Sequence, residues 1–343
     1  MKKTGRRGGV LWGLLLLLVV VGATAAYSLL RTGRLEPPAP AGTVLTGLVG
    51  DEALPLLTDP EVQAILRERY DLALVARPAS PGELVRRGAA EADFLWATSE
   101  ATAATYRLTG GPLVTAEQML RSPLVLYTWD AIAEALACEG LAEGDGADYY
   151  TVDMARLLDE IVAGRTWEEW GVEGLPGAAW IATPDPRQSA VGALYVGLLA
   201  ETLGGEGALP EIRALLAGQG YLYPTAGGLL GQYVRQGPGA WPLVVGLESQ
   251  LSALRAEHPE EGTRIAERLR TLYPRPAVWS VQTLLVLTER AAPLAEALGD
   301  ADIQHLAHTR YGYRVAQGAT EAPGPAVTVD PAAIDRIILG LEQ

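Results

Sequence analysis

Hydrophobic residues are arranged along this chain in three distinct patterns. Residues 10–30 form one uncharged stretch built around LWGLLLLLVVV. Farther along, short continuous apolar runs such as 123–129 (PLVLYTW) and 243–247 (LVVGL) have the length and composition of buried strands. Between these runs, apolar residues recur every three or four positions, which predicts helices with one buried face. Strands that alternate with helices predict mostly parallel sheets flanked by helices, and therefore an α/β fold.

The order of the expected elements follows from these patterns. The expected strands are residues 43–50, 71–76, 92–96, 123–129, 178–183, 243–247, 270–274 and 278–287. The expected helices are a segment that begins at Asp59 and then residues 83–89, 101–107, 153–163, 190–203, 212–217, 229–235, 291–298, 302–311 and 331–341. Residues 113–120 are expected to form a connection between two elements.

The uncharged stretch 10–30 follows four basic residues within the first seven. A basic end stays in the cytoplasm while an apolar run enters the membrane, so the rest of the chain is expected to face outward. The 21 residues of the stretch are long enough for a membrane-spanning helix. Its densest apolar part is only residues 11–21, followed by a small-x-small sequence at 23–25, which equally fits a cleaved signal peptide. Both alternatives predict an extracytoplasmic protein, either anchored in the membrane by its N-terminal helix or secreted.

The composition narrows the class further. The chain has 41 Asp and Glu against 27 Lys and Arg, and a formal charge of −14. Such a surface repels nucleic acid, so we expect no nucleic-acid partner. The only cysteine, Cys138, cannot form an intramolecular disulfide, so stability must come from a hydrophobic core. After a proline-rich linker at 36–42, the remaining length suits two domains better than one.

No pattern of residues predicts catalysis or metal binding. The sequence lacks GxSxG, GxxxxGK and HExxH. His305 and His308 lie three positions apart but have no third ligand nearby. The segment 143–148 resembles only half of a calcium loop, because Arg156 stands where the bidentate glutamate belongs. We therefore expect no enzyme activity, no metal and no cofactor.

Four segments, taken in order, carry a resemblance to a known family. They are TGLVGDE, ADFLWATSEATAATYR, WIATPDPRQSAVGALYVGLLA and LTERAAPLAEALGDADIQHLAHTRYGYR. Together they resemble type II periplasmic solute-binding proteins, the extracellular receptors of ABC importers, over about residues 43–314. Related proteins often have a serine in the first loop, where this chain has Leu48 and Val49. This departure argues against a side-chain hydroxyl ligand from that loop.

The resemblance implies two α/β lobes joined by crossing strands, a small-molecule ligand in the cleft between them, and an ABC permease as partner. The implied divisions are 1–42 for the leader and linker, 43–126 and 276–318 for the first lobe, 127–275 for the second lobe, and 319–343 for a tail with a helix. The crossing strands near 125–129 and 270–278 would form the hinge.

Ligands of open α/β sheets bind beyond the carboxyl ends of the strands, where helix N-termini offer free N–H groups. We expect one cleft to be lined by residues at such strand ends and helix starts. These residues are Thr46, Thr98, Ser99, Tyr127, Trp129, Asp185, Ser189, Gly227 and Ser280. Each hydroxyl side chain could instead only cap its helix, and each aromatic side chain could pack at the margin of the core.

The sequence leaves the ligand and the role open. An oxyanion would be held mostly by neutral dipoles, because no lysine follows Lys3. A sugar-like ligand would stack on Trp129 or Trp279, with Asp185 accepting its hydroxyl hydrogens. Arg187 would either neutralise an anion or only balance Asp185. An anchored sensory or scaffold domain with the same fold is an alternative to a transport receptor, and an exported enzyme is a further one.

Overall fold

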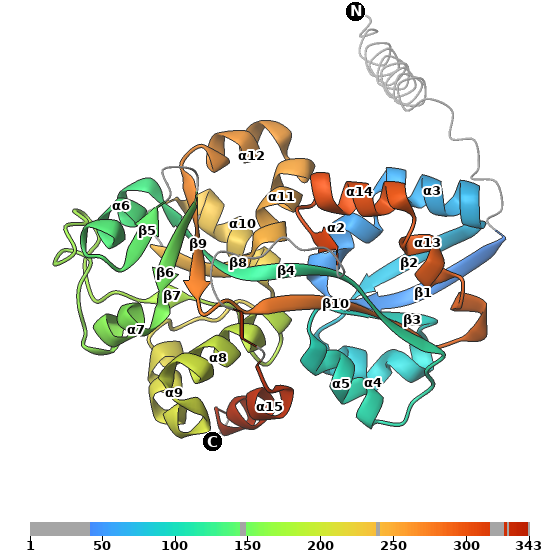
Figure 1. The fold of residues 1–343 in the computed structure, drawn as a ribbon, viewed down its shortest axis with the longest axis horizontal. Coiled ribbons are helices and arrows are strands. Elements are labelled where there is room, and N and C mark those ends of the chain that lie inside the picture. Colours follow the sequence, from blue (N-terminus) through green and yellow to red (C-terminus); the bar gives the residue numbers. More distant parts are fainter. Residues whose placement is uncertain (1–41, 145–148, 238–240, 316–325, 328, 342–343) are drawn as a thin grey trace, which may run out of the picture. The chain divides into compact units, whose positions relative to one another are not determined.

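The computed structural model describes residues 42–144, 149–237, 241–315, 326–327 and 329–341 (Figure 1). The predicted leader, its cleavage site and almost all of the proline-rich linker lie outside the described residues, as does the beginning of the tail. Among the residues that are described, no helix combines the length and the apolarity needed to cross a membrane.

Helices and strands alternate through most of the described chain. The α-helices are α2 (Leu54–Leu57), α3 (Pro60–Tyr70), α4 (Pro81–Glu91), α5 (Glu100–Leu108), α6 (Asp130–Cys138), α7 (Met154–Val162), α8 (Ala190–Leu203), α9 (Leu209–Ala217), α10 (Ala226–Gln236), α11 (Glu248–Glu257), α12 (Pro259–Ala266), α13 (Leu294–Leu298), α14 (Ala301–Thr309) and α15 (Pro331–Gly340). The short 3-10 helices are η1 (Asp51–Ala53), η2 (Gly205–Ala208) and η3 (Glu289–Ala291). The strands are β1 (Thr43–Val49), β2 (Leu72–Pro78), β3 (Phe94–Ala97), β4 (Thr115–Trp129), β5 (Ala142–Gly144), β6 (Tyr149–Asp153), β7 (Ile181–Ala182), β8 (Leu243–Leu247), β9 (Leu269–Arg275), β10 (Trp279–Val286) and β11 (Arg314–Val315).

Sheet A has the strand order β2-β1-β3-β10-β4, and β11 also pairs with β4. β1 runs parallel to β2 and β3, whereas β10 runs antiparallel to β3 and β4. Side chains from α2, α3, α13 and α14 pack on one face of sheet A, and side chains from α4 and α5 pack on the other (Figure 1). Covering both faces requires apolar side chains on both sides of a strand, which is why all four residues of β3 are buried.

Sheet B forms the second group of pairings. β4 pairs with β8 and β9, β6 lies between β9 and β5, and β7 pairs with β8. The β6–β9 and β7–β8 pairs are parallel, and the others are antiparallel. A separate hydrophobic core, with buried side chains from α6 to α10, surrounds this sheet. The α/β class predicted from the sequence is confirmed.

The strand β4 belongs to both sheets. Residues 115–123 pair with β10 in sheet A, and residues 124–129 pair with β8 and β9 in sheet B. The chain returns to sheet A through the link from β9 to β10, where the backbone N–H of Leu124 donates to the carbonyl of Val278 at 2.8 Å. We call this region, where the two chain segments pass side by side between the sheets, the junction (Figure 1).

Two expected elements differ most clearly from the structure, while the helix expected at 291–298 is divided into η3 and α13. The prediction of a connection at 113–120 is wrong for most of that segment. Residues 115–120 pair with β10 and belong to one strand of 15 residues. The strand expected at 178–183 shortens to Ile181–Ala182. Its beginning pairs elsewhere, since Ala178 forms a bridge with Thr166 and the N–H of Ala179 donates to the carbonyl of Arg165.

The last helix, α15, packs against both α8 and α5 (Figure 1). Its Ile334 and Ile337 are buried. Gly197 of α8 makes room for this contact, because a Cβ at that position would lie 2.7 Å from Val329 Cγ1 and 3.1 Å from Ile334 Cδ1. The C-terminal segment therefore contacts helices that cover different sheets.

Asp93, just before β3, ties three segments of sheet A together. Its carboxylate accepts hydrogen bonds from the backbone N–H of Thr46 at 2.9 Å, from Nε of Arg290 at 2.6 Å and from the hydroxyl of Thr288 at 3.1 Å. Burial opposes ionisation of this carboxyl, but the hydrogen bonds outweigh burial, so the pKa of Asp93 lies below its ordinary value.

We expect Asp93→Asn to lower the free energy of unfolding by about 1–2 kcal/mol at neutral pH, because charged hydrogen bonds are replaced by neutral ones. A carboxyl with a depressed pKa stabilises the fold above its unfolded-state pKa, and this stabilisation is lost as the pH falls through its folded-state pKa. The difference from wild type in urea unfolding should therefore shrink in acid. Asp302→Asn is the control, because Asp302 pairs with Arg69 at an exposed site and should matter little. Equal losses for the two variants would contradict this role of Asp93.

Candidate functional site

A chain of buried polar side chains lies in sheet A, next to the junction. Nε1 of Trp96 donates to Oε1 of Gln282 at 2.8 Å. Nε2 of Gln282 donates to the Ser280 hydroxyl at 2.8 Å, and that hydroxyl donates to the carbonyl of Thr98 at 2.6 Å. Ser280 and Gln282 are fully buried. Buried polar groups need partners, so this network fixes the end of β3 against β10.

Two acidic residues, Asp51 and Glu52, continue this network. They form η1 directly after β1. Gly50 allows the loop to approach the end of β3, because a Cβ at Gly50 would lie 2.5 Å from Cγ2 of Thr98. Glu52 is only 7% exposed. The backbone carbonyl of Glu52 accepts a hydrogen bond from the Tyr313 hydroxyl at 2.8 Å, which holds the turn in place.

Burial raises the pKa of Glu52 well above its ordinary value, and the neighbouring charge of Asp51 raises it further. Hydrogen bonding to Thr98 opposes this rise only in part. Burial also raises the pKa of Asp51, while hydrogen bonding to Glu52, to the backbone of Gly227 and to Thr225 opposes that rise. Two adjacent buried carboxyl groups cannot both ionise easily, so Glu52 holds a proton more strongly than an exposed glutamate does.

Asp51 belongs to the sheet A side of the chain but faces the first turn of α10. A Cβ added at Gly227 would lie 3.6 Å from Oδ2 of Asp51. The helix begins at Thr225, whose hydroxyl accepts a hydrogen bond from the N–H of Gly228 at 3.0 Å. Free N–H groups and the helix dipole favour a negative group at this position. Asp51 is therefore well placed to supply such a group from the same chain.

A hollow of about 110 Å³ opens beside this contact, and we call it the junction hollow. It is lined by residues from η1, α10, α11 and the start of α2, among them Asp51, Glu52, Gly227, Gln250 and Glu257. Among the described residues that line it, three are acidic and none is basic. Its volume is well below the roughly 300–1,000 Å³ of sites that enclose a drug-sized ligand.

A second polar cluster precedes α8. Asp185 is buried and accepts hydrogen bonds from Nε of Arg187 at 2.8 Å and from Nε2 of Gln188 at 3.0 Å. Burial alone would raise the pKa of Asp185, but the bonds from Arg187 and Gln188 bring it below the ordinary value. Ser189 caps α8, since its hydroxyl accepts from the N–H of Gly192 at 3.4 Å.

A hollow of about 270 Å³ lies between this second cluster and α5. Ser99 and Thr102 line it from the sheet A side, Pro186 and Arg187 line it from the sheet B side, and α15 contributes Asp335. Ser99 caps α5 by accepting from the N–H of Thr102 at 3.2 Å. Two helix starts from different sheets therefore face one hollow, which is the arrangement expected of a cleft between lobes.

The structure brings some of the nine predicted site residues together. Thr98 and Ser280 are hydrogen-bonded, and Asp51 and Glu52 lie between Thr98 and Gly227. Ser99 lines the hollow described above, which Arg187 also lines, and Asp185 and Ser189 lie in the cluster next to it.

Three other predicted residues lie apart. The ring of Tyr127 is fully buried in the core of sheet B, where its hydroxyl donates to the carbonyl of Leu247. Trp129 lies in the same core, 5.2 Å from the ring of Tyr233. Thr46 precedes the residues of β1 that pair with β3, whereas Thr98 follows the end of β3. The nine residues therefore do not form one continuous lining in the described structure, and their ligand role stays a prediction.

Sequence reasoning missed Asp51, Glu52 and Gln282. The signal for the two acids was available, because they directly follow the first strand at its carboxyl end. Their burial was not visible, since it depends on α10, which lies about 175 residues farther along the chain. The predicted sugar-stacking ring of Trp279 is approached by the guanidinium groups of Arg121, at 4.8 Å, and Arg314, at 5.1 Å.

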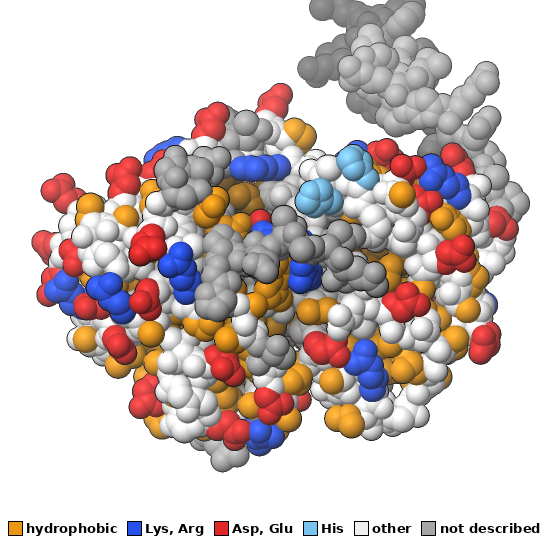
Figure 2. All heavy atoms as spheres, viewed as in Figure 1, with side chains coloured by type: hydrophobic (Ala, Val, Ile, Leu, Met, Phe, Trp, Pro, Cys, Tyr) orange, Lys and Arg blue, Asp and Glu red, His pale blue; other side chains and the backbone are white. Residues whose placement is uncertain are grey.

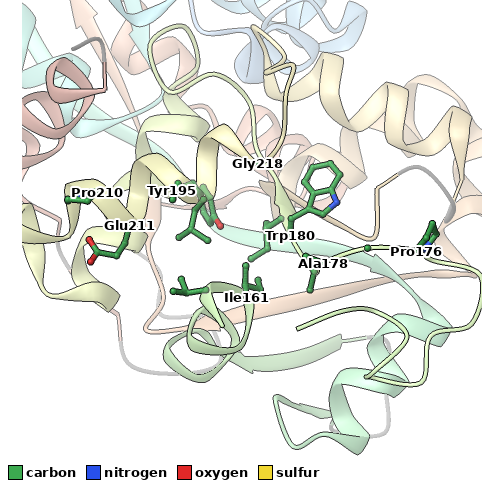
Figure 3. A pocket seen from close by; sticks show the side chains of 14 residues that line it. Ile161, Pro176, Ala178, Trp180, Tyr195, Pro210, Glu211 and Gly218 are labelled. Carbon is green, nitrogen blue, oxygen red and sulfur yellow. The ribbon is translucent and has the colours of Figure 1, made fainter. Parts of the chain in front are cut away.

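A further hollow lies on the sheet B side alone. It has a volume of about 660 Å³ and mostly apolar walls, with Ile161 from α7, Tyr195 from α8, Glu211 from α9 and Trp180 around it (Figure 3). None of the nine predicted site residues lines it. The volume of a hollow therefore does not identify the junction as the candidate site. The buried polar side chains there do.

Solved structures share this fold. The substrate-binding protein of an ABC transporter from Agrobacterium tumefaciens matches with a TM-score of 0.60 at 17% identity, covering 89% of this chain and 96% of that one. A periplasmic thiamin-binding protein matches with a TM-score of 0.62 at 12% identity, covering 90% and 98%. The sulfate-binding protein SubI from Mycobacterium tuberculosis H37Rv matches with a TM-score of 0.57 at 12% identity, covering 86% and 98%.

The fold is therefore that of the substrate-binding proteins of ABC transporters, and the resemblance found in the sequence is confirmed at the level of the fold. No protein-family model matches the sequence, and no curated protein matches it. At these identities the likeness defines the fold, and function has to be argued from the site.

Proposed function

We propose that this protein is an extracytoplasmic solute-binding receptor that captures a small polar ligand between its two lobes for an ABC-type importer. The observation that carries the proposal is a buried polar cluster: Gln282, Ser280 and Thr98 are hydrogen-bonded in sheet A, and the carboxyl groups of Glu52 and Asp51 lie between Thr98 and the first turn of α10. Buried polar groups cost stability relative to apolar packing, so a cluster of them where η1 meets α10 supports a binding role.

The lobes of this proposal follow the predicted boundaries. Residues 43–126 and 276–318 form the first lobe and 127–275 the second, with the hinge near 125–129 and 270–278. The passage of β4 from sheet A into sheet B and the return from β9 to β10 support this division. Strands that continue from one lobe into the other can absorb the small dihedral changes of closure.

The location and partners belong to the same proposal. An N-terminal helix would anchor the protein, or a signal peptide would release it, and a permease would take up the solute. The described surface agrees with a freely exposed receptor, because acidic side chains are spread over the face drawn in Figure 2 and do not gather in one patch. The structural neighbours are binding proteins. An anchored sensory domain with the same fold is the second candidate function. A permease gene next to the gene for this protein would favour transport over sensing.

Thermal-shift screening with oxyanion salts, amine salts and sugars tests the proposal, since a ligand that binds only the folded state raises its melting temperature. For the compound that emerges, we expect Ser189→Ala to weaken binding by about 1–2 kcal/mol in isothermal titration, because one buried hydroxyl contact is lost.

The matched control is Thr166→Ala. Its hydroxyl also accepts a local backbone N–H, from Glu169 at 3.2 Å, but Thr166 is half-buried and lies in the segment between α7 and β7. Wild-type affinity in Ser189→Ala, or an equal loss in Thr166→Ala, would remove Ser189 from the site.

A further inference from the structure

We propose that the junction hollow selects a solute bearing a small ammonium-type cation, and that Asp51 and Glu52 supply the charge that recognises it. This inference rests on the proposed receptor function and adds the chemical class of the ligand. It departs from both ligand classes expected from the sequence, an oxyanion held by helix N-termini and a sugar stacked on Trp129 or Trp279.

The charge of the hollow is the first argument. Asp51, Glu52 and Glu257 line it, and no Lys, Arg or His is among its described lining residues. An anion here would face carboxyl groups without a compensating cation, whereas an ammonium group would be attracted.

The second argument is an incomplete hydrogen-bond set. Oε1 of Glu52 is buried and has no hydrogen-bond partner in the described structure, although the residue is only 7% exposed. A buried carboxyl oxygen without a donor is costly, and such atoms call for an explanation. A cation with N–H groups supplies that donor, since an ammonium group carries three donors and no acceptor.

The third argument concerns α10, the element that would otherwise bind an anion. Asp51 already faces its first turn and interacts with Gly227 and Thr225. An oxyanion would have to displace this carboxylate, which is tethered to the same chain and therefore present at high effective concentration. A cation would leave Asp51 in place, because it would bind to the negatively charged carboxylate of Asp51 itself.

Size and donor set favour an organic cation over a metal ion. In the described part of the chain, no group of three or more His, Cys, Asp or Glu residues is arranged to hold a metal. The volume of about 110 Å³ accommodates an alkylammonium group of a few heavy atoms. A longer solute would place only its cationic end in this hollow.

Binding of the cation should release a proton. Besides each other, Asp51 and Glu52 face Glu257 of α11 and the phenol ring of Tyr313. In the empty site, burial and the neighbouring carboxyl of Asp51 raise the pKa of Glu52, which favours its protonated form. A bound ammonium group favours the ionised pair, so the Glu52 proton leaves to the solvent while no covalent bond to the ligand forms.

The test uses the full chain in detergent and three two-carbon probes that differ in charge: ethylammonium chloride, ethanol and sodium acetate. Ethylammonium should raise the melting temperature of the wild type, and ethanol and acetate should not. Glu52→Gln and Asp51→Asn should each weaken ethylammonium binding at least tenfold in isothermal titration. Titration in buffers of different ionisation enthalpy should show proton release in the wild type and none in Glu52→Gln.

The control for charge is Glu168→Gln, which removes one negative charge from an exposed position outside the junction hollow and should bind as the wild type does. Far-ultraviolet circular dichroism checks that each variant folds. The inference is overturned if ethylammonium has no effect, or if Glu52→Gln binds it with wild-type affinity. If sulfate binds and Ser189→Ala weakens it, the receptor function stands while the cation selectivity fails.

Discussion

Trp129→Ala should lower the free energy of unfolding by about 3–5 kcal/mol, because it empties a large space in a closely packed core. The ring of Trp129 is only 6% exposed and packs in the core of sheet B at 5.2 Å from Tyr233. Removing so large a side chain leaves a cavity that β4 and α10 cannot fill, because both are fixed by their other contacts. Urea unfolding measures this loss of stability when it is monitored by far-ultraviolet circular dichroism, a signal that does not rely on tryptophan.

Trp129→Phe is the matched variant for this prediction. It keeps an aromatic ring beside Tyr233 and removes Nε1, a buried atom that has no hydrogen-bond partner in the described structure. We expect it to recover more than half of the stability lost in Trp129→Ala, since the remaining ring fills most of the volume. If Trp129→Ala unfolds like the wild type but loses ligand affinity, the residue belongs to the binding surface and its packing role is refuted.

Gly192→Ala should cost about 3 kcal/mol of stability, through overpacking at the start of α8. A Cβ at this position would lie 2.5 Å from the carbonyl oxygen of Pro184 and 2.9 Å from Cα of Pro186. These are backbone atoms, so the strain cannot be relieved by rotating a flexible side chain. The loop that carries Asp185 would have to move, and the polar cluster before α8 would move with it.

Gly207→Ala provides the comparison for this substitution. A Cβ at Gly207 would meet nothing within 4 Å, and the effect should stay within about 0.5 kcal/mol. Melting temperatures and urea midpoints of the two variants are the measurement. Equal stability of Gly192→Ala and Gly207→Ala would show that the loop before α8 yields easily, contrary to its tight packing.

The helix α8 shows what could be predicted from the sequence. Its predicted limits, 190–203, agree with the structure because both ends carry local signals. Ser189 caps the beginning, and Gly204 ends the helix with a φ of +99°. The strand β8 was equally clear, since all five of its residues are buried and apolar.

Elements whose form depends on distant partners were harder to predict. Residues 115–122 of β4 (TAEQMLRS) do not alternate regularly between polar and apolar positions, and Pro123 follows them, so a break between two elements was a reasonable interpretation. The ladder with β10, which is about 160 residues away, makes them one strand. The helices α6, α11 and α12 were missed, because their short sequences contain many alanine or charged residues and show no long apolar stripe.

The same distinction applies to the site. Hydroxyl residues at helix starts, such as Ser99 and Ser189, could be selected because capping has a sequence signature. Asp51 and Glu52 have no such signature, and only the approach of α10 and of the end of β3 makes them a buried pair. Conversely, Tyr127 and Trp129 stand at the end of a strand in the sequence, but that end lies inside the core of sheet B. A strand end alone therefore does not distinguish a cleft from a core.

The most direct test of the receptor proposal is a distance across the two lobes. The exposed Cys138 of α6 provides one labelling site on the sheet B side, and Leu108→Cys at the end of α5, where the side chain is 87% exposed, provides the other. Pulsed electron spin resonance on the doubly labelled chain would compare the empty protein with protein saturated by the compound that raises its melting temperature most. Capture between closing lobes predicts a shorter and narrower distance distribution on saturation. An unchanged distribution with that compound bound would contradict the account.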